Sequence, residues 1–183
     1  MDKRITLGKK KFSYVHLDLF DEGYELLSQI TLIDFNLKKL ADYSKYSITT
    51  VYEHFESSID IFLIEFFGYL RKKRIEEYQQ IYTLNGKENI VQMFTKFTDF
   101  MNDELLLWTN LKAARVLLRD KKVTPFFLID ELHFQAEGAN LKSELIKKIT
   151  DQFYTYENDF IENPSNRSEL TSKFIDELRN TLK

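Results

Sequence analysis

The sequence of 183 residues has no cysteine, only two prolines and only five glycines. Without cysteine the chain can form no disulfide and no thiolate nucleophile, and a reducing compartment such as the cytoplasm suits it. The scarcity of proline and glycine leaves long stretches in which no residue interrupts a helix. This favours helices over a fold of strands and tight turns.

Long hydrophobic runs are also missing. The most apolar stretch, residues 59–70, contains Asp60 and Glu65, whereas a transmembrane helix needs about 20 apolar residues. The first eleven residues are charged and lack the apolar core of a signal peptide. Hydrophobic residues still make up 43% of the chain, which is enough to bury a substantial core. We therefore expect a cytoplasmic protein with no membrane partner.

Apolar residues recur every three or four positions along most of the chain, which predicts an all-α protein of about nine helices. Start and stop signals mark several helix ends: Ser47 and Asn140 as caps, Thr124-Pro125 as a start, and residues 166–169 as a capping box. Asn85-Gly86 is expected to be a stop and turn. The expected helices cover about residues 13–29, 37–44, 47–56, 57–81, 87–107, 111–118, 124–138, 140–160 and 166–182.

The fourth of these helices is apolar on nearly every side in its first half, so it must be covered from more than one direction. We interpret it as the connector between two domains, residues 1–56 and residues 57–183. The first would carry a basic N-terminal arm with Lys3, Arg4 and residues 9–11. A second basic run, residues 71–74, lies well along the connector, where pairing with Glu76 and Glu77 explains it.

Residues 40–55 are the most informative segment. They read as two short helices joined by a tight turn, and the second helix opens at Ser47 and carries Thr50, Tyr52 and His54. A short helix with small polar groups at its start is typical of the recognition helix of a helix-turn-helix motif. The segment therefore indicates DNA binding.

In residue type and spacing, Leu40-Ala41, Ser47, Thr50-Val51-Tyr52 and His54-Phe55 resemble the DNA-binding domain of the TetR/AcrR family of bacterial transcription regulators. The resemblance covers about residues 13–65. It implies an N-terminal three-helix helix-turn-helix domain, followed by a helical bundle that binds an effector and dimerises. The expected function is a transcriptional regulator, a repressor, that binds double-stranded DNA at a palindromic operator.

Carried over position by position, the resemblance implies that Ser47, Thr50, Tyr52 and His54 face the phosphate backbone or support that face. Hydroxyl and imidazole groups donate to phosphate oxygens without reading the base sequence. The variable positions of the pattern can point into the major groove, where side chains meet base edges. These positions hold Ile48, Thr49 and Glu53, and Lys38 and Lys45 add positive charge beside the motif.

Three features depart from the family pattern. Lys45 replaces the usual glycine of the turn, which costs roughly 1 kcal/mol if the backbone there is left-handed. Ser58 stands where the family often has a phosphate-binding lysine. Asp34, Asp42, Glu53 and Glu56 make the domain less basic than a DNA-binding domain normally is, and the net charge of the chain is −3. These departures motivate the alternative of a helical adaptor that keeps the family's shape and acts through protein partners.

Aromatic stripes in residues 57–183 could line a cavity for a small, largely apolar effector, or they could be plain core packing. Arg115 and His133 are the polar candidates to orient such a ligand. The full set of effector candidates is Phe66, Phe94, Phe97, Met101, Trp108, Arg115, Phe126 and His133.

The two C-terminal helices carry apolar stripes from Leu141 to Phe160 and from Leu170 to Leu182, and the resemblance implies that they form a homodimer interface. Two-fold symmetry suits a palindromic operator because each recognition helix meets one half-site. The histidines, His16, His54 and His133, lack metal-ligand spacing. No phosphate loop or catalytic constellation stands out, so we expect no metal, no cofactor and no enzymatic activity.

Overall fold

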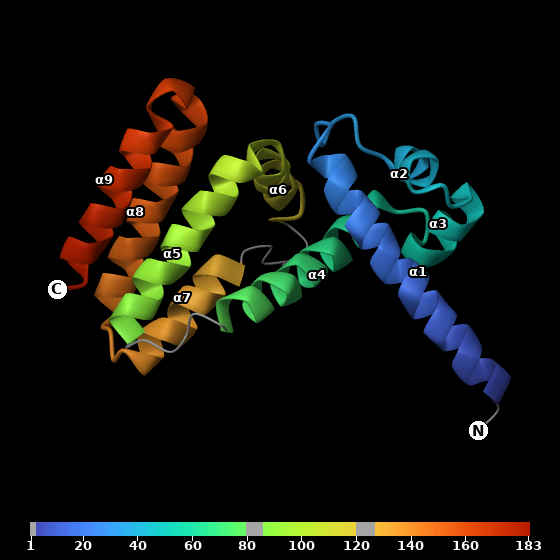
Figure 1. Ribbon diagram of the computed structural model, residues 1–183, viewed down its shortest axis with the longest axis horizontal. Helices are drawn as coiled ribbons and strands as arrows, with labels where there is room; N and C mark the ends of the chain where they lie inside the picture. Colours follow the sequence, from blue (N-terminus) through green and yellow to red (C-terminus); the bar gives the residue numbers. More distant parts are fainter. Residues whose placement is uncertain (1–2, 80–85, 120–126) are drawn as a thin grey trace. The chain divides into compact units, whose positions relative to one another are not determined.

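The computed structural model describes the backbone of residues 3–79, 86–119 and 127–183. Within these ranges the secondary structure is helical throughout, with nine α-helices and no strand (Figure 1). The prediction of an all-α protein with about nine helices is confirmed. No helix among the described residues has the length and apolar character to cross a bilayer. The helices are α1 (Lys3–Leu27), α2 (Leu37–Ser44), α3 (Ile48–Phe55), α4 (Ile59–Gln79), α5 (Gly86–Asp103), α6 (Leu105–Leu117), α7 (Phe127–Gly138), α8 (Ser143–Glu162) and α9 (Arg167–Thr181), with a 3-10 helix at Pro164–Asn166.

The chain divides into two compact units. Unit 1 comprises Met1–Leu70 and Leu106–Pro125, and unit 2 comprises Arg71–Leu105 and Phe126–Lys183. Unit 1 thus joins α1, α2 and α3 to the first half of α4 and to α6. The expected functional boundary at residue 56 divides the chain by role and stays a prediction.

The core of unit 1 is a cluster of phenylalanine rings from four segments of the chain. Phe20 of α1 and Phe55 of α3 lie 5.7 Å apart between ring centroids, and Phe62 of α4 contacts Phe55 edge-on at 5.1 Å. Phe35, before α2, packs on Phe62 at 5.1 Å. Aromatic pairs of this geometry add to the free energy of area burial. The cluster fixes α3 against α1 and α4.

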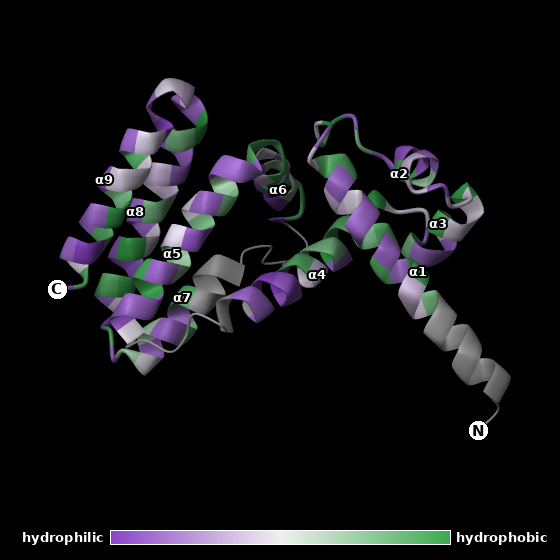
Figure 2. Ribbon diagram, viewed as in Figure 1, coloured by the Kyte–Doolittle hydropathy of each residue, from purple (hydrophilic) through white to green (hydrophobic). Residues whose placement is uncertain are grey.

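The core of unit 2 is formed by α5, α7, α8 and α9. Helix α5 buries Ile90, Met93, Phe94 and Phe97 and packs against α7 and α9. It therefore lies at the centre of unit 2. Figure 2 shows hydrophobic and hydrophilic residues alternating along α8 and α9, as an amphipathic helix requires.

The apolar stripes of α8 and α9 are buried inside unit 2. Tyr156 of α8 stacks on Phe174 of α9 with ring centroids 4.5 Å apart, and Phe153 lies 6.1 Å from the same ring. Phe160, Leu178 and Leu182 are buried as well. These residues form the core within one protomer, and the prediction that α8 and α9 form a homodimer interface stays a prediction.

Helix α1 begins at Lys3, ten residues before the expected start. The segment containing Lys3, Arg4 and residues 9–11, expected as an arm, is the first part of this helix. Hydrophobic periodicity could not reveal it, since Ile5 and Leu7 are the apolar side chains of residues 3–11 and lie two positions apart, which is not the spacing of a helical stripe.

Two other helix ends differ from the prediction. One expected helix over 87–107 is interrupted at Glu104, so that Leu105 and Trp108 lie on α6; no glycine or proline marks this break. Asn140 does not cap α8. It adopts a left-handed conformation with φ of 54°, and Leu141 N donates to Ala136 O at 2.9 Å. Such 6→1 closure is a C-terminal Schellman-type motif, so Asn140 ends α7.

The remaining signals have mixed outcomes. Asn166 makes no side-chain cap hydrogen bond, so the capping box at residues 166–169 does not form. Gly86 is the first residue of α5, while Asn85 and the Thr124-Pro125 start lie outside the described residues. The basic run of α4 pairs within its helix as expected, because Arg74 meets Glu77 at 2.7 Å.

Candidate nucleic-acid interface

Helices α2 and α3 form a helix-turn-helix whose corners are held by local hydrogen bonds. Asn36 Oδ1 accepts from Lys39 N at 2.9 Å and caps α2. Lys45 then takes a left-handed conformation with φ of 61° and ψ of 12°. Ser47 Oγ accepts from Thr50 N at 3.1 Å and caps α3, which confirms the predicted start of this helix.

The turn is also tied to α1. The Tyr46 hydroxyl donates to Asp18 Oδ2 at 2.7 Å, and this hydrogen bond raises the pKa of Tyr46 because it stabilises the protonated phenol. The Gln29 amide donates to the Tyr43 hydroxyl at 2.9 Å. These bonds position the corner between α2 and α3 relative to α1.

One face of α3 is buried and the other is open to solvent. Val51 and Phe55 are fully buried against the core of unit 1. The exposed side includes Ile48 and Tyr52, which are 37% and 41% exposed despite their apolar surface. Ser47, Thr49 and Glu53 are exposed on the same helix. The open face therefore carries hydroxyl, aliphatic, aromatic and carboxylate groups on an eight-residue helix.

The hydroxyls of this face are partly occupied. Ser47 Oγ and Thr50 Oγ1 lie 2.8 Å apart and share a hydrogen bond, and Thr50 is only half-exposed. A hydroxyl has one donor and two acceptor positions, so both groups keep capacity for another partner.

Charges of both signs surround α3. Lys38, Lys39 and Lys45 are exposed, and so are Asp42 and Glu53. The positive side chains lie on α2 and its C-cap, while Glu53 and the exposed C-cap residue Glu56 belong to α3 itself. Carboxylates therefore lie among the positive charges, and the surface around α3 is less basic than expected of a DNA-binding surface.

His54 lies on the side of α3 that meets α1. Its ring is 8% exposed, and Phe12 of α1 stacks on it at 3.9 Å between centroids. His54 Nδ1 lies 3.0 Å from His16 Nδ1, and His16 Nε2 lies 3.1 Å from Glu65 Oε2. Burial, followed by the neighbouring His16, lowers the pKa of His54.

Sequence reasoning missed this histidine pair. His16 was considered only as a metal ligand, and Glu65 only as an interruption of an apolar run. The two histidines are 38 positions apart, so no local pattern connects them. One pattern in the sequence could have indicated it. His16 lies four positions from both Phe12 and Phe20, so all three side chains share one face of α1.

A second missed residue is Asn110 of α6, which is buried in unit 1. Its Nδ2 donates to Leu27 O and to Ile30 O, and its Oδ1 accepts from Leu32 N, each at 2.7 Å. Asn110 therefore provides hydrogen-bond partners for backbone carbonyl and N–H groups of the segment where α1 ends. The sequence pattern that could have indicated this role is the position of Asn110, a polar amide within the apolar stripe of α6.

The effector candidates fall in both compact units. Phe94, Phe97 and Met101 are buried in unit 2, where Phe94 packs on Phe153 at 5.4 Å and on Phe174 at 5.5 Å. Phe66 and Trp108 are buried in unit 1, Arg115 is half-exposed on α6, and His133 is exposed on α7. Phe126 lies outside the described residues.

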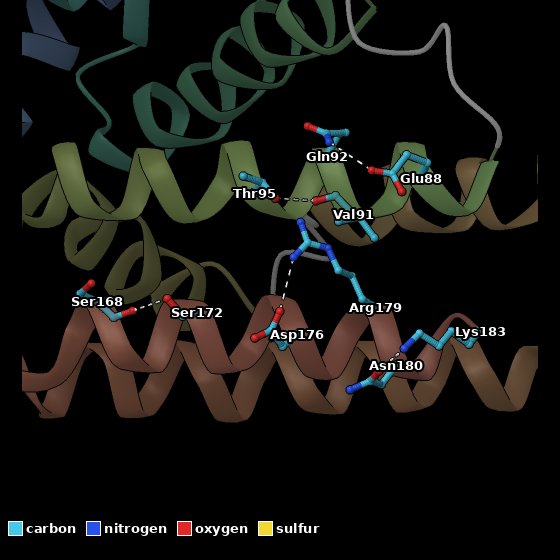
Figure 3. Close-up of polar contacts among 10 residues, drawn as sticks. All are labelled: Glu88, Val91, Gln92, Thr95, Ser168, Ser172, Asp176, Arg179, Asn180 and Lys183. Carbon is cyan, nitrogen blue, oxygen red and sulfur yellow. Dashed lines mark hydrogen bonds and ion pairs between the residues drawn. The ribbon is translucent and has the colours of Figure 1, made fainter.

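The best-defined groove within unit 2 runs between α8 and α9 and has a volume of about 450 Å³. It contains none of the effector candidates. Most of its lining residues have charged or polar side chains, but apolar atoms contribute more of its surface than polar atoms do. Figure 3 shows that polar groups near the C-terminus are paired locally, Arg179 with Asp176 and Lys183 with Asn180. The lining residues are Glu144, Lys147, Lys148, Asp151, Gln152, Thr155, Tyr156, Asp159, Leu170, Lys173, Phe174 and Glu177.

No protein-family model matches the chain, and no curated protein matches it by sequence. Among solved structures, the chain is similar to the crystal structure of a TetR transcriptional regulator from Rhodococcus sp. RHA1. The TM-score is 0.67, and the alignment covers 94% of this chain and 97% of that chain at 11% sequence identity. The arrangement of α2 and α3 and the helical bundle that follows are thus those of the TetR fold, which this chain has over nearly its whole length.

Proposed function

We propose that the chain is a DNA-binding transcriptional regulator whose recognition helix is α3. The observation that carries this proposal is the open face of α3, which is capped at Ser47 and held from behind by Val51 and Phe55. A short, rigidly seated helix with exposed polar groups at its start suits the major groove. The expected outcome of binding at an operator is repression of transcription.

Within this proposal, Ser47, Thr50 and Tyr52 contact phosphates, together with Lys38 and Lys45. Ile48, Thr49 and Glu53 contact base edges. Threonine can bond a base or touch a thymine methyl, and glutamate can accept from the amino group of cytosine. The phosphate contacts provide affinity, while the base contacts select the sequence.

The regulator would act as a homodimer on a palindromic operator. Because the apolar stripes of α8 and α9 are core, the proposed interface is the outer surface of these helices, along the groove that contains Thr155 and Lys173. The groove carries both lysine and carboxylate side chains, which is compatible with a self-complementary interface, since two-fold symmetry places residue i of one copy against residue j of the other, and j against i.

A small, largely apolar effector would modulate operator affinity. Its binding site would involve the aromatic residues of unit 2, with Phe94, Phe97 and Met101 as candidates. One polar feature supports this location: the buried Asn89 donates to Gln135 Oε1 at 3.1 Å, while its own Oδ1 is a buried acceptor without a described partner. An effector acts only through its different affinities for the two states of the regulator.

The second candidate function is an adaptor that acts through protein partners without binding DNA. The carboxylates on α3, Glu53 and Glu56, favour it because they oppose phosphate binding. Salt dependence separates the two functions. A DNA regulator must lose duplex affinity steeply as salt rises, through release of counterions, whereas an adaptor would bind no duplex even in dilute salt.

The test is selection of binding sequences from a random duplex library, followed by affinity measurements between about 50 and 200 mM salt. Loss of one phosphate contact in Tyr52→Phe should weaken binding to all duplexes alike and leave the salt slope unchanged, because the tyrosine hydroxyl carries no charge. Thr49→Ala should change the selected sequence. Ile33→Ala, at a site 98% exposed before α2, is the control and should change neither. Recovery of no sequence at any salt concentration would support the adaptor.

A further inference from the structure

Three side chains form a hydrogen-bonded chain behind the recognition helix. Glu65 of α4 contacts His16 Nε2 at 3.1 Å, and His16 Nδ1 lies 3.0 Å from His54 Nδ1 of α3. All three residues belong to unit 1. A hydrogen bond between two ring nitrogens requires a proton on one of them and a lone pair on the other. The protonation of each ring therefore depends on its neighbour.

The state of the chain with two neutral rings follows from this requirement. Ionised Glu65 accepts only, so His16 must carry its proton on Nε2 and present a lone pair at Nδ1. His54 must then donate from Nδ1, which leaves a lone pair on its other nitrogen, Nε2. The hydrogen bond between the two rings occupies His54 Nδ1. Some buried side-chain atoms of the described residues lack a hydrogen-bond partner, and His54 Nε2 is not one of them. A lone pair at Nε2 cannot donate to a phosphate oxygen.

One added proton reverses the direction of the bond between the rings. If His16 carries protons on both nitrogens, it donates from Nε2 to Glu65 and from Nδ1 to His54. His54 then accepts at Nδ1 and holds its own proton on Nε2, where it can donate to a phosphate. Without the added proton, the same state of His54 would place a lone pair of His16 against the Glu65 carboxylate, which is unfavourable.

We propose that His16 and Glu65 are positioning residues that couple duplex binding to the uptake of one proton, by switching His54 from an acceptor to a donor at Nε2. This inference rests on the proposed function. The proton adds to His16 and forms an ion pair with Glu65. His54 stays neutral and shifts its proton from Nδ1 to Nε2, so that the charge of the three groups rises by one.

The surroundings of the pair support this assignment. On α3, Glu53 favours a positive His54, but burial and His16 oppose it more strongly and lower the pKa of His54. On α4, Glu65 faces His16 directly. The other close neighbours are the rings of Phe12, Phe20 and Phe55, which carry no charge. The added charge is therefore held beside Glu65 and away from the buried ring.

The first test needs no DNA. Nitrogen-15 spectra of the histidine rings in the full chain should show His54 as the Nδ1–H form and His16 as the Nε2–H form at pH about 8, above the usual titration range of histidine. Acidification should move the His54 proton to Nε2 while the ring stays neutral. A His54 ring that is already in the Nε2–H form at alkaline pH would overturn the inference.

The second test measures affinity for the duplex selected above between pH of about 5.5 and 8.5. One-proton uptake predicts that the wild-type dissociation constant rises by up to tenfold per pH unit on the alkaline side. Glu65→Gln should remove this slope and bind more tightly than wild type at high pH. The reason is that a glutamine amide can donate to the lone pair of His16 Nε2 and allow the donor form of His54 without a proton.

Glu56→Gln is the matched control, because it removes the same charge from an exposed residue at the end of α3. It should shift affinity equally at every pH and keep the wild-type slope. If Glu65→Gln keeps the wild-type slope, the inference is overturned and the proposed function stands. If wild type binds no selected duplex at any pH, the proposed function is overturned as well.

Discussion

At the scale of single residues, four of the non-glycine residues that the structure describes adopt the left-handed backbone conformation that glycine tolerates best. Lys45 precedes α3, and Glu56 and Ser57 follow it, with φ values of 61°, 50° and 58°. The fourth is Asn140, at the end of α7. Each non-glycine residue in this region costs about 1–2 kcal/mol. The side chains at these positions therefore lower the stability of the protein.

Lys45→Gly should stabilise the protein by up to about 1 kcal/mol, since the gain from relieving the left-handed residue exceeds the larger entropy of glycine in the unfolded chain. Urea denaturation measures the change. The matched control is Lys39→Gly on the exposed side of α2, which should destabilise by about 1 kcal/mol because glycine is poor within a helix. Equal effects at both sites would contradict the strain at Lys45.

Some residue-level features could be predicted because they are local. The cap at Ser47 depends on a serine followed by a helix, and both are visible in the sequence. The role of Gly23 could not be judged in the same way. A glycine inside a helix costs about 1 kcal/mol relative to alanine, but an added Cβ at Gly23 would lie 2.6 Å from Phe62 Cζ. A glycine is required at this position because of the Phe62 ring, which is 39 positions away along the chain. No local sequence pattern indicates this contact.

At the scale of elements, the end of α1 is held by α6 through Asn110. The amide supplies two donors to backbone carbonyls and one acceptor to a backbone N–H. Helix ends leave carbonyl groups without partners, and here a side chain from another helix satisfies them. The orientation of the segment between α1 and α2 therefore depends on α6.

Asn110→Asp should destabilise unit 1 more than Asn110→Ala, because a carboxylate would face the carbonyl oxygens of Leu27 and Ile30. The loss should exceed about 3 kcal/mol, as a buried charge without a partner is costly. Urea denaturation followed by fluorescence reports the change. Asn102→Asp, at an exposed position of α5, adds the same charge and should change stability by less than about 0.5 kcal/mol. The prediction fails if Asp is tolerated better than Ala at position 110.

Element types were predictable from periodicity, whereas some boundaries were not. The break at Glu104 between α5 and α6 has no glycine, proline or cap, so it depends on packing rather than on local sequence. The first turns of α1 were hidden because residues 3–11 are mostly polar and Ile5 and Leu7 form no helical stripe. In contrast, α3 was located correctly, since Ser47 and the apolar pair Val51 and Phe55 mark it from both sides.

At the scale of the whole molecule, the chain has the TetR fold although its sequence identity to the similar structure is 11%. A helix carries an apolar stripe both when it packs in the core of one protomer and when it packs at an interface between two copies. Periodicity along α8 and α9 therefore could not show which of the two buries Phe153 and Phe174. The fold assigns them to the core, and the proposed dimer surface moves to the outside of these helices.

Thr155→Arg places a bulky cation in the proposed interface of α8, at an exposed residue of the groove. Dimerisation should weaken at least tenfold while helix content stays unchanged, because two equivalent arginines would approach each other across the symmetry axis. Sedimentation equilibrium measures the change. Ala113→Arg, on the exposed side of α6, is the control and should dimerise as wild type does. Unchanged association in Thr155→Arg would move the interface elsewhere.

The left-handed residues on either side of α3 limit how the recognition helix can respond to a signal. Backbone positions of this kind occupy a small allowed region, so neither end of α3 can serve as a smooth hinge. With Phe55 in the ring cluster and His54 bonded to His16, tilting α3 alone would break several contacts together. In the proposed regulator, an effector would therefore move α1, α2 and α3 together, and change the distance between the recognition helices of the two copies rather than the tilt of α3 within one groove.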